Sequence, residues 1–184
     1  LETYFLPYIK SKSKVIDLGM GPTARHSIYF SNKGHKVTGV DISISTLESA
    51  RKYIDNFSEV SDIKTIHADI VTLEQIKDKY DLVFCWSTFG HIPSYLSLDA
   101  LNTFNRILNK GGYCLINFWP EKEKNLKEIF HYNWYWIGHL IKKQFVKTFP
   151  VNCSLYTANE IEDMVKRTNF KIIKNIEGIY LLQK

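Results

Sequence analysis

Short apolar runs alternate with longer segments of helical periodicity along most of this chain. The predicted strands are residues 14–18, 36–40, 64–68, 80–85, 113–118, 171–176 and 178–183, and the predicted helices are residues 25–32, 45–57, 73–77, 98–108 and 158–168. Strands separated by helices pair in parallel and are covered by those helices. The last two strands are joined only by Glu177–Gly178, a link too short for a parallel crossover, so this pair is predicted to be antiparallel. The pattern indicates an α/β fold with a seven-stranded, mostly parallel sheet.

A length of 184 residues suits one domain, predicted to span residues 1–184. Residues 119–150 interrupt the alternation and contain three of the four tryptophans. Apolar residues recur there at helical spacing, which predicts a helical aromatic insertion. Four roles fit this insertion: a lid over a small-molecule acceptor, a packing helix, an RNA contact or a membrane contact.

The first predicted strand ends in a turn suited to a nucleotide. Asp17 is followed by Gly19, Met20 and Gly21, and a predicted helix comes next. Glycines allow a sharp bend and let a ligand approach the main chain. Asp41 ends the next strand, 20 residues beyond Gly21, where an acid can accept both hydroxyl groups of an adenosine ribose.

Residues 19–24 also match the G-x-G-x-x-G/A fingerprint of dinucleotide-binding enzymes. Two features oppose an NAD-dependent enzyme. Asp17 would bring a negative charge near a pyrophosphate, whereas it could hold the ammonium group of a methionine moiety, and the antiparallel terminal pair differs from a second mononucleotide-binding half. Both favour a ligand with an adenosine and an amino acid but no phosphate.

In order along the chain, residues 15–21, 25–30, 33–43, 67–70, 80–83, 108–112, 156–160 and 169–170 resemble the motifs of class I S-adenosylmethionine-dependent methyltransferases. The resemblance implies a three-layer Rossmann-like fold, S-adenosylmethionine as methyl donor and S-adenosylhomocysteine as product. It implies cofactor contacts at Asp17, Gly19, Met20, Gly21, Asp41, Ile42, Ala68, Asp69, Ile70, Cys85 and Trp86. Asp69 matches the acid that contacts the adenine amino group. Pro22-Thr23-Ala24 replaces the usual third glycine, which leaves a non-catalytic cofactor-binding relative as an alternative.

The acceptor side of the predicted site carries weaker signals. His91 follows the fourth strand and is the candidate general base, with a packing or capping role as the alternative. The same loop lacks the Asn/Asp-Pro-Pro-aromatic sequence of amino-methylating relatives, which disfavours methylation of adenine N6 or of glutamine. Aromatic-lined concavities suit small organic ligands, so the insertion as a lid leads us to expect a small-molecule acceptor.

A net charge of +5 and a pI near 9.0 leave tRNA or rRNA as the alternative acceptor. Cys85, Cys114 and Cys153 are widely spaced and predicted to be free thiols, and no His or Cys pairing suggests a metal. No apolar run approaches the length of a membrane span and no leader sequence is visible, so a cytoplasmic protein is expected. The sequence carries no signal for an oligomeric state.

Overall fold

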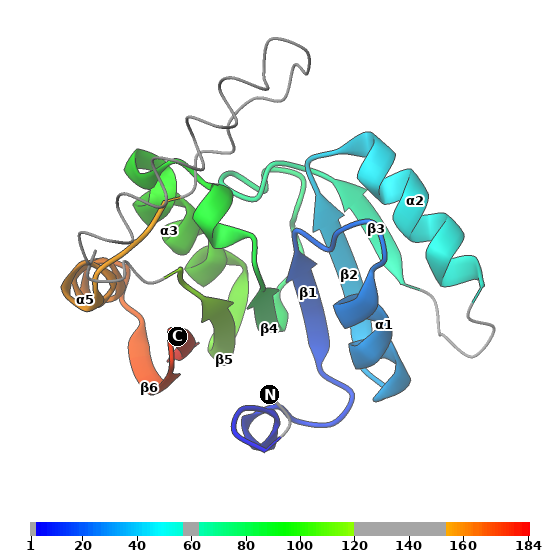
Figure 1. Ribbon diagram of the computed structural model, residues 1–184. Helices are drawn as coiled ribbons and strands as arrows, with labels where there is room; N and C mark the ends of the chain where they lie inside the picture. Colours follow the sequence, from blue (N-terminus) through cyan, green and yellow to red (C-terminus); the bar gives the residue numbers. More distant parts are fainter. Residues whose placement is uncertain (1–2, 57–62, 120–153) are drawn as a thin grey trace, which may run out of the picture.

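One twisted sheet organises the computed structural model, which describes residues 3–56, 63–119 and 154–184 (Figure 1). The strand order is β3-β2-β1-β4-β5-β7-β6. The strands are β1 Lys14–Leu18, β2 Lys36–Asp41, β3 Lys64–His67, β4 Tyr80–Cys85, β5 Leu108–Asn117, β6 Lys171–Ile176 and β7 Ile179–Gln183. Strand β7 is antiparallel to both of its neighbours and all other pairs are parallel. The predicted seven-stranded, mostly parallel sheet with an antiparallel last strand is confirmed.

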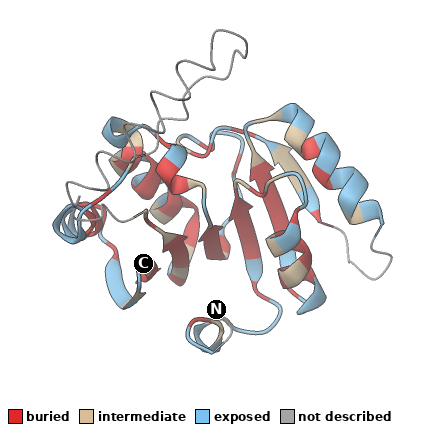
Figure 2. Ribbon diagram, in the orientation of Figure 1, coloured by how far each residue is buried: buried red, intermediate tan, exposed pale blue. Residues whose placement is uncertain are grey.

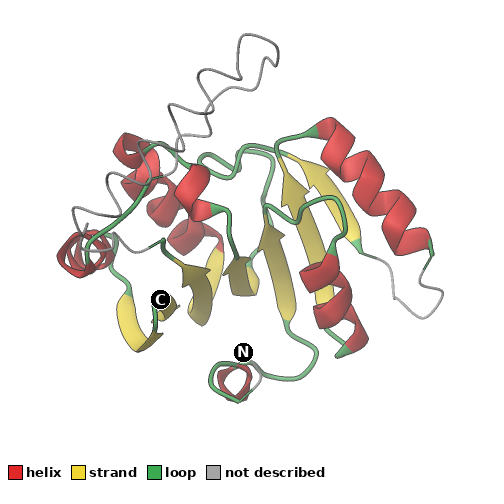
Figure 3. Cartoon of the chain, in the orientation of Figure 1, coloured by secondary structure: helices red, strands yellow, loops and turns green. Residues whose placement is uncertain are grey.

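Helices cover both faces of this sheet (Figure 3). They are α1 Arg25–Asn32, α2 Ile44–Asp55, α3 Ser97–Ile107 and α5 Ala158–Arg167, together with the short 3-10 helices η1 Leu6–Tyr8, η2 Phe89–His91 and η3 Ser94–Leu96. Helices α1 and α2 pack on one face, and α3 and α5 pack on the other. The molecule therefore has the three layers of a Rossmann-like fold.

The two hydrophobic cores follow from the period of two in a strand. On β4, Leu82 and Phe84 belong to the core under α1 and α2, whereas Val83 and Cys85 belong to the core under α3 and α5. Because the central strands are buried on both faces, they are apolar at nearly every position. Figure 2 shows this as buried central strands beneath helices that are exposed on their outer sides.

Residues 73–77 are not helical, so the predicted helix there is wrong. Leu73 has a φ of +44°, a left-handed conformation that an α-helix excludes. The Leu73 side chain is fully buried and Ile76 is nearly so, and the Ile76 N–H donates to the Leu73 carbonyl at 3.1 Å. Leu73 and Ile76 are therefore three residues apart because turns place both side chains in the core, and not because they lie on one face of a helix.

Local signals explain two of the element ends near the C-terminus. Thr157 caps α5: its Oγ1 accepts from the Glu160 N–H at 3.3 Å, and a Glu160 carboxylate oxygen accepts from the Thr157 N–H at 2.8 Å. Glu177 and Gly178 both have positive φ, +49° and +83°, as the two-residue turn between antiparallel strands requires.

The predicted aromatic insertion lies outside the described residues except for Trp119, as does Phe57 at the end of a predicted helix. Within the part of the chain that the structure describes, no helix combines the length and apolar character needed to cross a membrane.

Candidate functional site

The turn after β1 has the sharp bend that its glycines allow. Gly19 and Gly21 have φ of +75° and +69°. The N–H groups of Gly19 and Met20 both donate to the Val40 carbonyl, at 2.8 and 3.0 Å, which fixes this turn to the end of β2. A Cβ at Gly21 would meet no atom within 4 Å, so the main chain there is open to a ligand.

Ala24 stands where the third glycine of the family motif is expected. It adopts a φ of +47°, directly before α1, and its side chain is fully buried. A left-handed alanine costs roughly 1–2 kcal/mol relative to its ordinary conformation. The turn therefore keeps the shape that a glycine would give it.

Two acids stand at the carboxyl ends of β2 and β3. The Asp41 carboxylate accepts from the Ser43 N–H at 3.0 Å and from the Gly21 N–H at 3.2 Å, which ties the acid to the glycine turn. The Asp69 Oδ1 accepts from the Val71 N–H at 2.8 Å. Each carboxylate retains lone pairs for further donors.

These groups meet at a cavity of about 540 Å³ over the carboxyl edge of the sheet. Its wall contains Gly19, Asp41, Ile42, Asp69, Ile70, Val71, Thr88, His91, Ile92, Pro93 and Leu96. Six of these are residues that the sequence singled out: Gly19, Asp41, Ile42, Asp69, Ile70 and His91. The crevice beyond the carboxyl ends of the strands is the general ligand site of such sheets.

Asp17, in β1, does not line this cavity. Its carboxylate is buried and accepts from the Ser27 hydroxyl at 2.7 Å. The pKa of Asp17 is raised to about 6, mainly by burial. The Ser27 hydrogen bonds oppose this rise, and the neighbouring Asp41 adds to it.

The other five sequence-selected residues also do not line the cavity. The Met20 side chain is buried and occupies the space that a Cβ at residue 39 would need, which Gly39 leaves free. Gly21 belongs to the glycine turn but is not part of the cavity wall. Ala68 is buried in the core beside β3.

Cys85 and Trp86, at the end of β4, complete that group of five. Cys85 is fully buried, and burial raises the pKa of its thiol well above the ordinary value. Trp86 stacks on Phe84, with ring centroids 5.9 Å apart, and lies near His26. Burial beside Arg25 lowers the pKa of His26 to about 4, which marks this histidine as a packed neutral ring.

Thr88 is a cavity residue missing from the predicted site. Its hydroxyl donates to the Trp86 carbonyl at 3.1 Å and weakly to the Gly19 carbonyl at 3.4 Å, and a Cβ at Gly19 would overlap its side chain. Ile92, Pro93 and Leu96, also missing, come from the segment around η2 and η3. In the sequence, the apolar pair Ile92-Pro93 directly after His91 is the only feature that could have indicated these cavity residues.

His91 stands on the cavity wall at the end of η2. Its ring contacts Trp119 edge-on, with centroids 4.9 Å apart, and Trp119 also packs on Gly90. Ser154 returns to the same loop, because its N–H donates to the Gly90 carbonyl and its hydroxyl to the Ile92 carbonyl, both at 2.7 Å. Trp119 and Ser154 therefore both contact residues 90–92, the loop that carries His91.

The described residues contain no group of three or more His, Cys, Asp or Glu side chains that could hold a metal ion. Cys85 and Cys114 are free and buried, while Cys153 lies outside the described residues.

Solved structures share this fold. The chain superposes on an S-adenosylmethionine-dependent methyltransferase from Methanosarcina mazei with a TM-score of 0.73 at 16% identity, covering 100% of this chain and 98% of that one. It superposes on the magnesium protoporphyrin IX methyltransferase of Synechocystis, solved with S-adenosylhomocysteine bound, with a TM-score of 0.67 at 19% identity, covering 92% and 73%. This likeness shows that the chain has the fold of class I methyltransferases.

Sequence comparison gives the family itself. The model of a family described as a methyltransferase domain matches residues 2–175, so the chain belongs to that family. A probable methyltransferase from Aspergillus luteorubrus is 27% identical over 150 residues, which cover 74% of this chain and 50% of that protein. The chain thus spans about half the length of this relative. The predicted methyltransferase superfamily is confirmed. The Synechocystis enzyme has also been solved with S-adenosylmethionine, the cofactor predicted for this chain.

Proposed function

We propose that this protein transfers a methyl group from S-adenosylmethionine to a small-molecule acceptor. The observation that carries the proposal is the meeting of Gly19, Asp41 and Asp69 at one cavity, at the carboxyl edge of the sheet. These residues come from three separate strand ends, and the residues present there fit an adenosine.

The polar groups of the cavity suit the two ends of an adenosine. Asp41 accepts from two backbone N–H groups and keeps lone pairs for the two ribose hydroxyls. Asp69 uses one oxygen for the Val71 N–H, which leaves the other for the adenine amino group. Adenine recognition thus falls to Asp69 and ribose recognition to Asp41.

Apolar side chains suit the faces of the adenine ring. Ile42 is 65% exposed at the cavity wall, so its apolar side chain has surface free to contact a ring. Ile70, Ile92 and Leu96 complete an apolar lining. A planar base against this lining would remove the exposed Ile42 side chain from water.

Asp17 fits the ammonium group of the methionine moiety through its charge. Burial disfavours the ionised carboxyl group and raises the pKa of Asp17. A cation placed near the glycine turn would offset this cost, because opposite charges stabilise each other strongly where water is excluded. Gly21, open above the main chain, leaves room for that group.

When bound, the sulfonium supplies an electrophilic methyl group, so this chain has to orient the reactants and exclude water. His91 lies on the cavity wall and could take a proton from an acceptor hydroxyl or amine. Trp119, edge-on to His91, offers an aromatic surface beside it. We place the acceptor at this wall.

Asp41→Ala tests the site. Two hydrogen bonds to a charged group contribute about 3 kcal/mol or more, so we expect S-adenosylhomocysteine to bind at least ~100-fold more weakly in isothermal titration calorimetry. Asp163→Ala, which removes an exposed acid on α5, is the control and should bind as the unaltered protein does. Unaltered affinity in Asp41→Ala would refute the site.

A further inference from the structure

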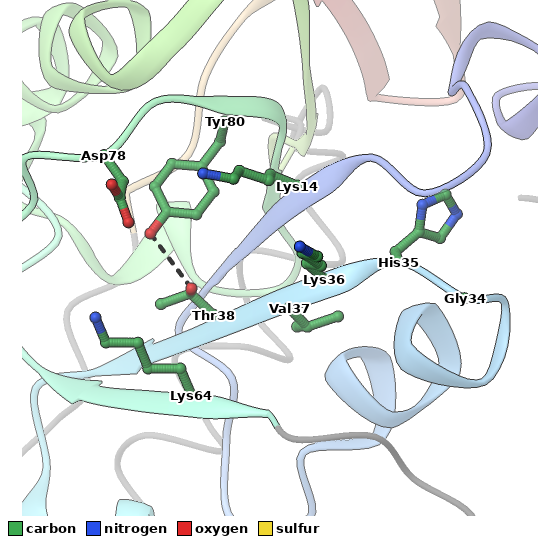
Figure 4. Close-up of a pocket in the computed structure, with 9 residues that line it drawn as sticks. All are labelled: Lys14, Gly34, His35, Lys36, Val37, Thr38, Lys64, Asp78 and Tyr80. Atoms are coloured by element: carbon green, nitrogen blue, oxygen red, sulfur yellow. Dashed lines mark hydrogen bonds between the residues drawn. The ribbon is translucent and has the colours of Figure 1, made fainter.

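A second cavity of about 540 Å³ lies at the opposite edge of the sheet, where β1, β2, β3 and β4 begin (Figure 4). Six polar residues in its wall matter here: Lys14, Lys36, Thr38, Lys64, Asp78 and Tyr80. This edge is distant from the carboxyl ends of the strands, so the cavity does not belong to the proposed methyl-transfer site.

The register of the parallel strands brings three lysines to one face. Lys14, Lys36 and Lys64 are the first residues of β1, β2 and β3. Lys14 is paired with Lys36, and Lys64 is paired with Thr38, two residues after Lys36. Since side chains alternate between faces with a period of two, all three lysines point to the same side of the sheet. Neighbouring strands are only ~4.8 Å apart, and all three lysines line the same cavity.

The charge of this space is not balanced. Within the described residues, none of the three lysines forms a salt bridge, and Asp78 is the only acid in the cavity wall. Asp81 lies nearby, where its carboxylate accepts from the Lys14 N–H at 2.8 Å and from the Asn109 amide at 2.7 Å. The three lysines therefore still outnumber the two neighbouring acids, Asp78 and Asp81. Like charges held together in a concavity attract a counter-anion.

Neutral donors accompany the lysines. The Tyr80 hydroxyl donates to Thr38 Oγ1 at 3.3 Å, and Figure 4 shows the Tyr80 hydroxyl between Asp78 and Thr38. Burial raises the pKa of Tyr80, so its hydroxyl stays protonated. Cationic and hydroxyl donors around one concavity are the set that recognises phosphoryl oxygens.

We infer that this cavity binds a small phosphorylated anion, whose phosphoryl oxygens contact Lys14, Lys36 and Lys64. The volume lies within the range of small-ligand pockets, ~300–1,000 Å³, and the concave shape favours a compact ligand over an extended nucleic-acid strand. A smaller cavity of about 150 Å³ shares Lys64, Asp78 and Tyr80 and adds Lys77, which gives a second phosphoryl group a place next to the first.

Inorganic pyrophosphate is the probe for this site, titrated by calorimetry at low ionic strength. We expect one molecule to bind per chain. Lys36→Gln/Lys64→Gln should weaken binding at least tenfold, since it removes two of the three charges. The control is Lys166→Gln/Lys171→Gln, which removes the same net charge from exposed positions on α5 and β6 and should change the affinity less than twofold.

Three results would overturn the inference: no binding of pyrophosphate to the unaltered protein, an equal loss in both double variants, or a single-stranded oligonucleotide that binds and is not displaced by pyrophosphate. S-adenosylhomocysteine should bind the Lys36→Gln/Lys64→Gln variant normally, and Asp41→Ala should bind pyrophosphate normally. These two cross-titrations separate a failure of this site from a failure of the proposed methyl-transfer site.

Discussion

Asp17 places a carboxyl group in the interior of the sheet. Its pKa rises from 3.8 to about 6, mainly because burial disfavours the charged form. The folded protein therefore binds a proton at this residue between pH 4 and 6, where the unfolded chain has released it. The contribution of Asp17 to stability is greatest below pH 4 and is lost as the pH rises through 6.

Asp17→Asn should consequently change how stability depends on pH. A rise of roughly two pKa units corresponds to about 3 kcal/mol, which the unaltered protein loses between pH 4 and 7 and the variant does not. Thermal denaturation at several pH values measures the difference. The prediction fails if the two stability curves stay parallel across this range.

The same variant tests the functional role proposed for Asp17. If the carboxylate holds the methionine ammonium group, Asp17→Asn gains stability at neutral pH and loses affinity for S-adenosylhomocysteine. Such an exchange of stability for function is common at binding sites.

At the scale of elements, the hairpin of β6 and β7 shows how a two-residue turn sets the edge of the sheet. Glu177 adopts a φ of +49° and Gly178 a φ of +83°. Asparagine followed by glycine is the favoured sequence for such turns, because asparagine tolerates a left-handed conformation better than glutamate does. Glu177 is thus the strained member of the pair.

Glu177→Asn should stabilise the protein by about 0.5–1 kcal/mol. The measurement is the free energy of unfolding in urea. Glu177→Ala is the matched control, because it removes the same charge and keeps the unfavourable conformation, and it should give no gain. Equal stabilities of the two variants would show that the charge, and not the backbone, decides.

At the scale of the whole molecule, the two cavities lie at opposite ends of the parallel strands. The carboxyl edge carries Asp41 and Asp69, while the amino edge carries the three lysines. Part of the net charge of +5 is therefore gathered away from the proposed methyl-transfer site. This separation is consistent with the small-molecule acceptor that we propose for the carboxyl edge.

Methyl transfer from tritiated S-adenosylmethionine distinguishes these acceptor classes. With a cell extract divided into a small-molecule ultrafiltrate and total RNA, we expect label in products of the ultrafiltrate. His91→Gln should lower that rate by ~10²–10⁴ if His91 is the general base, with unchanged S-adenosylhomocysteine affinity. Label in the RNA alone, with binding that weakens steeply as salt is added, would replace the small-molecule proposal.

Sequence was sufficient for the fold because its signals are local. The alternation of strand and helix patterns, the short link at Glu177–Gly178 and the glycines after β1 each act over a few residues, and parallel strands with covering helices allow few other arrangements. The helix expected at residues 73–77 was wrong because two buried residues at helical spacing, Leu73 and Ile76, also suit a turn that points inward.

The tertiary structure alone decided which side chains face a cavity. Gly19, Asp41, Ile42, Asp69, Ile70 and His91 meet at one edge, but the side chains of Met20 and Cys85, which follow the same motifs, turn into the core. Thr88 and the three basic strand starts became visible only once strand register placed distant residues side by side. Local sequence sets the order of elements and their turns, whereas register and packing set the direction of each side chain, because these depend on residues far apart in the chain.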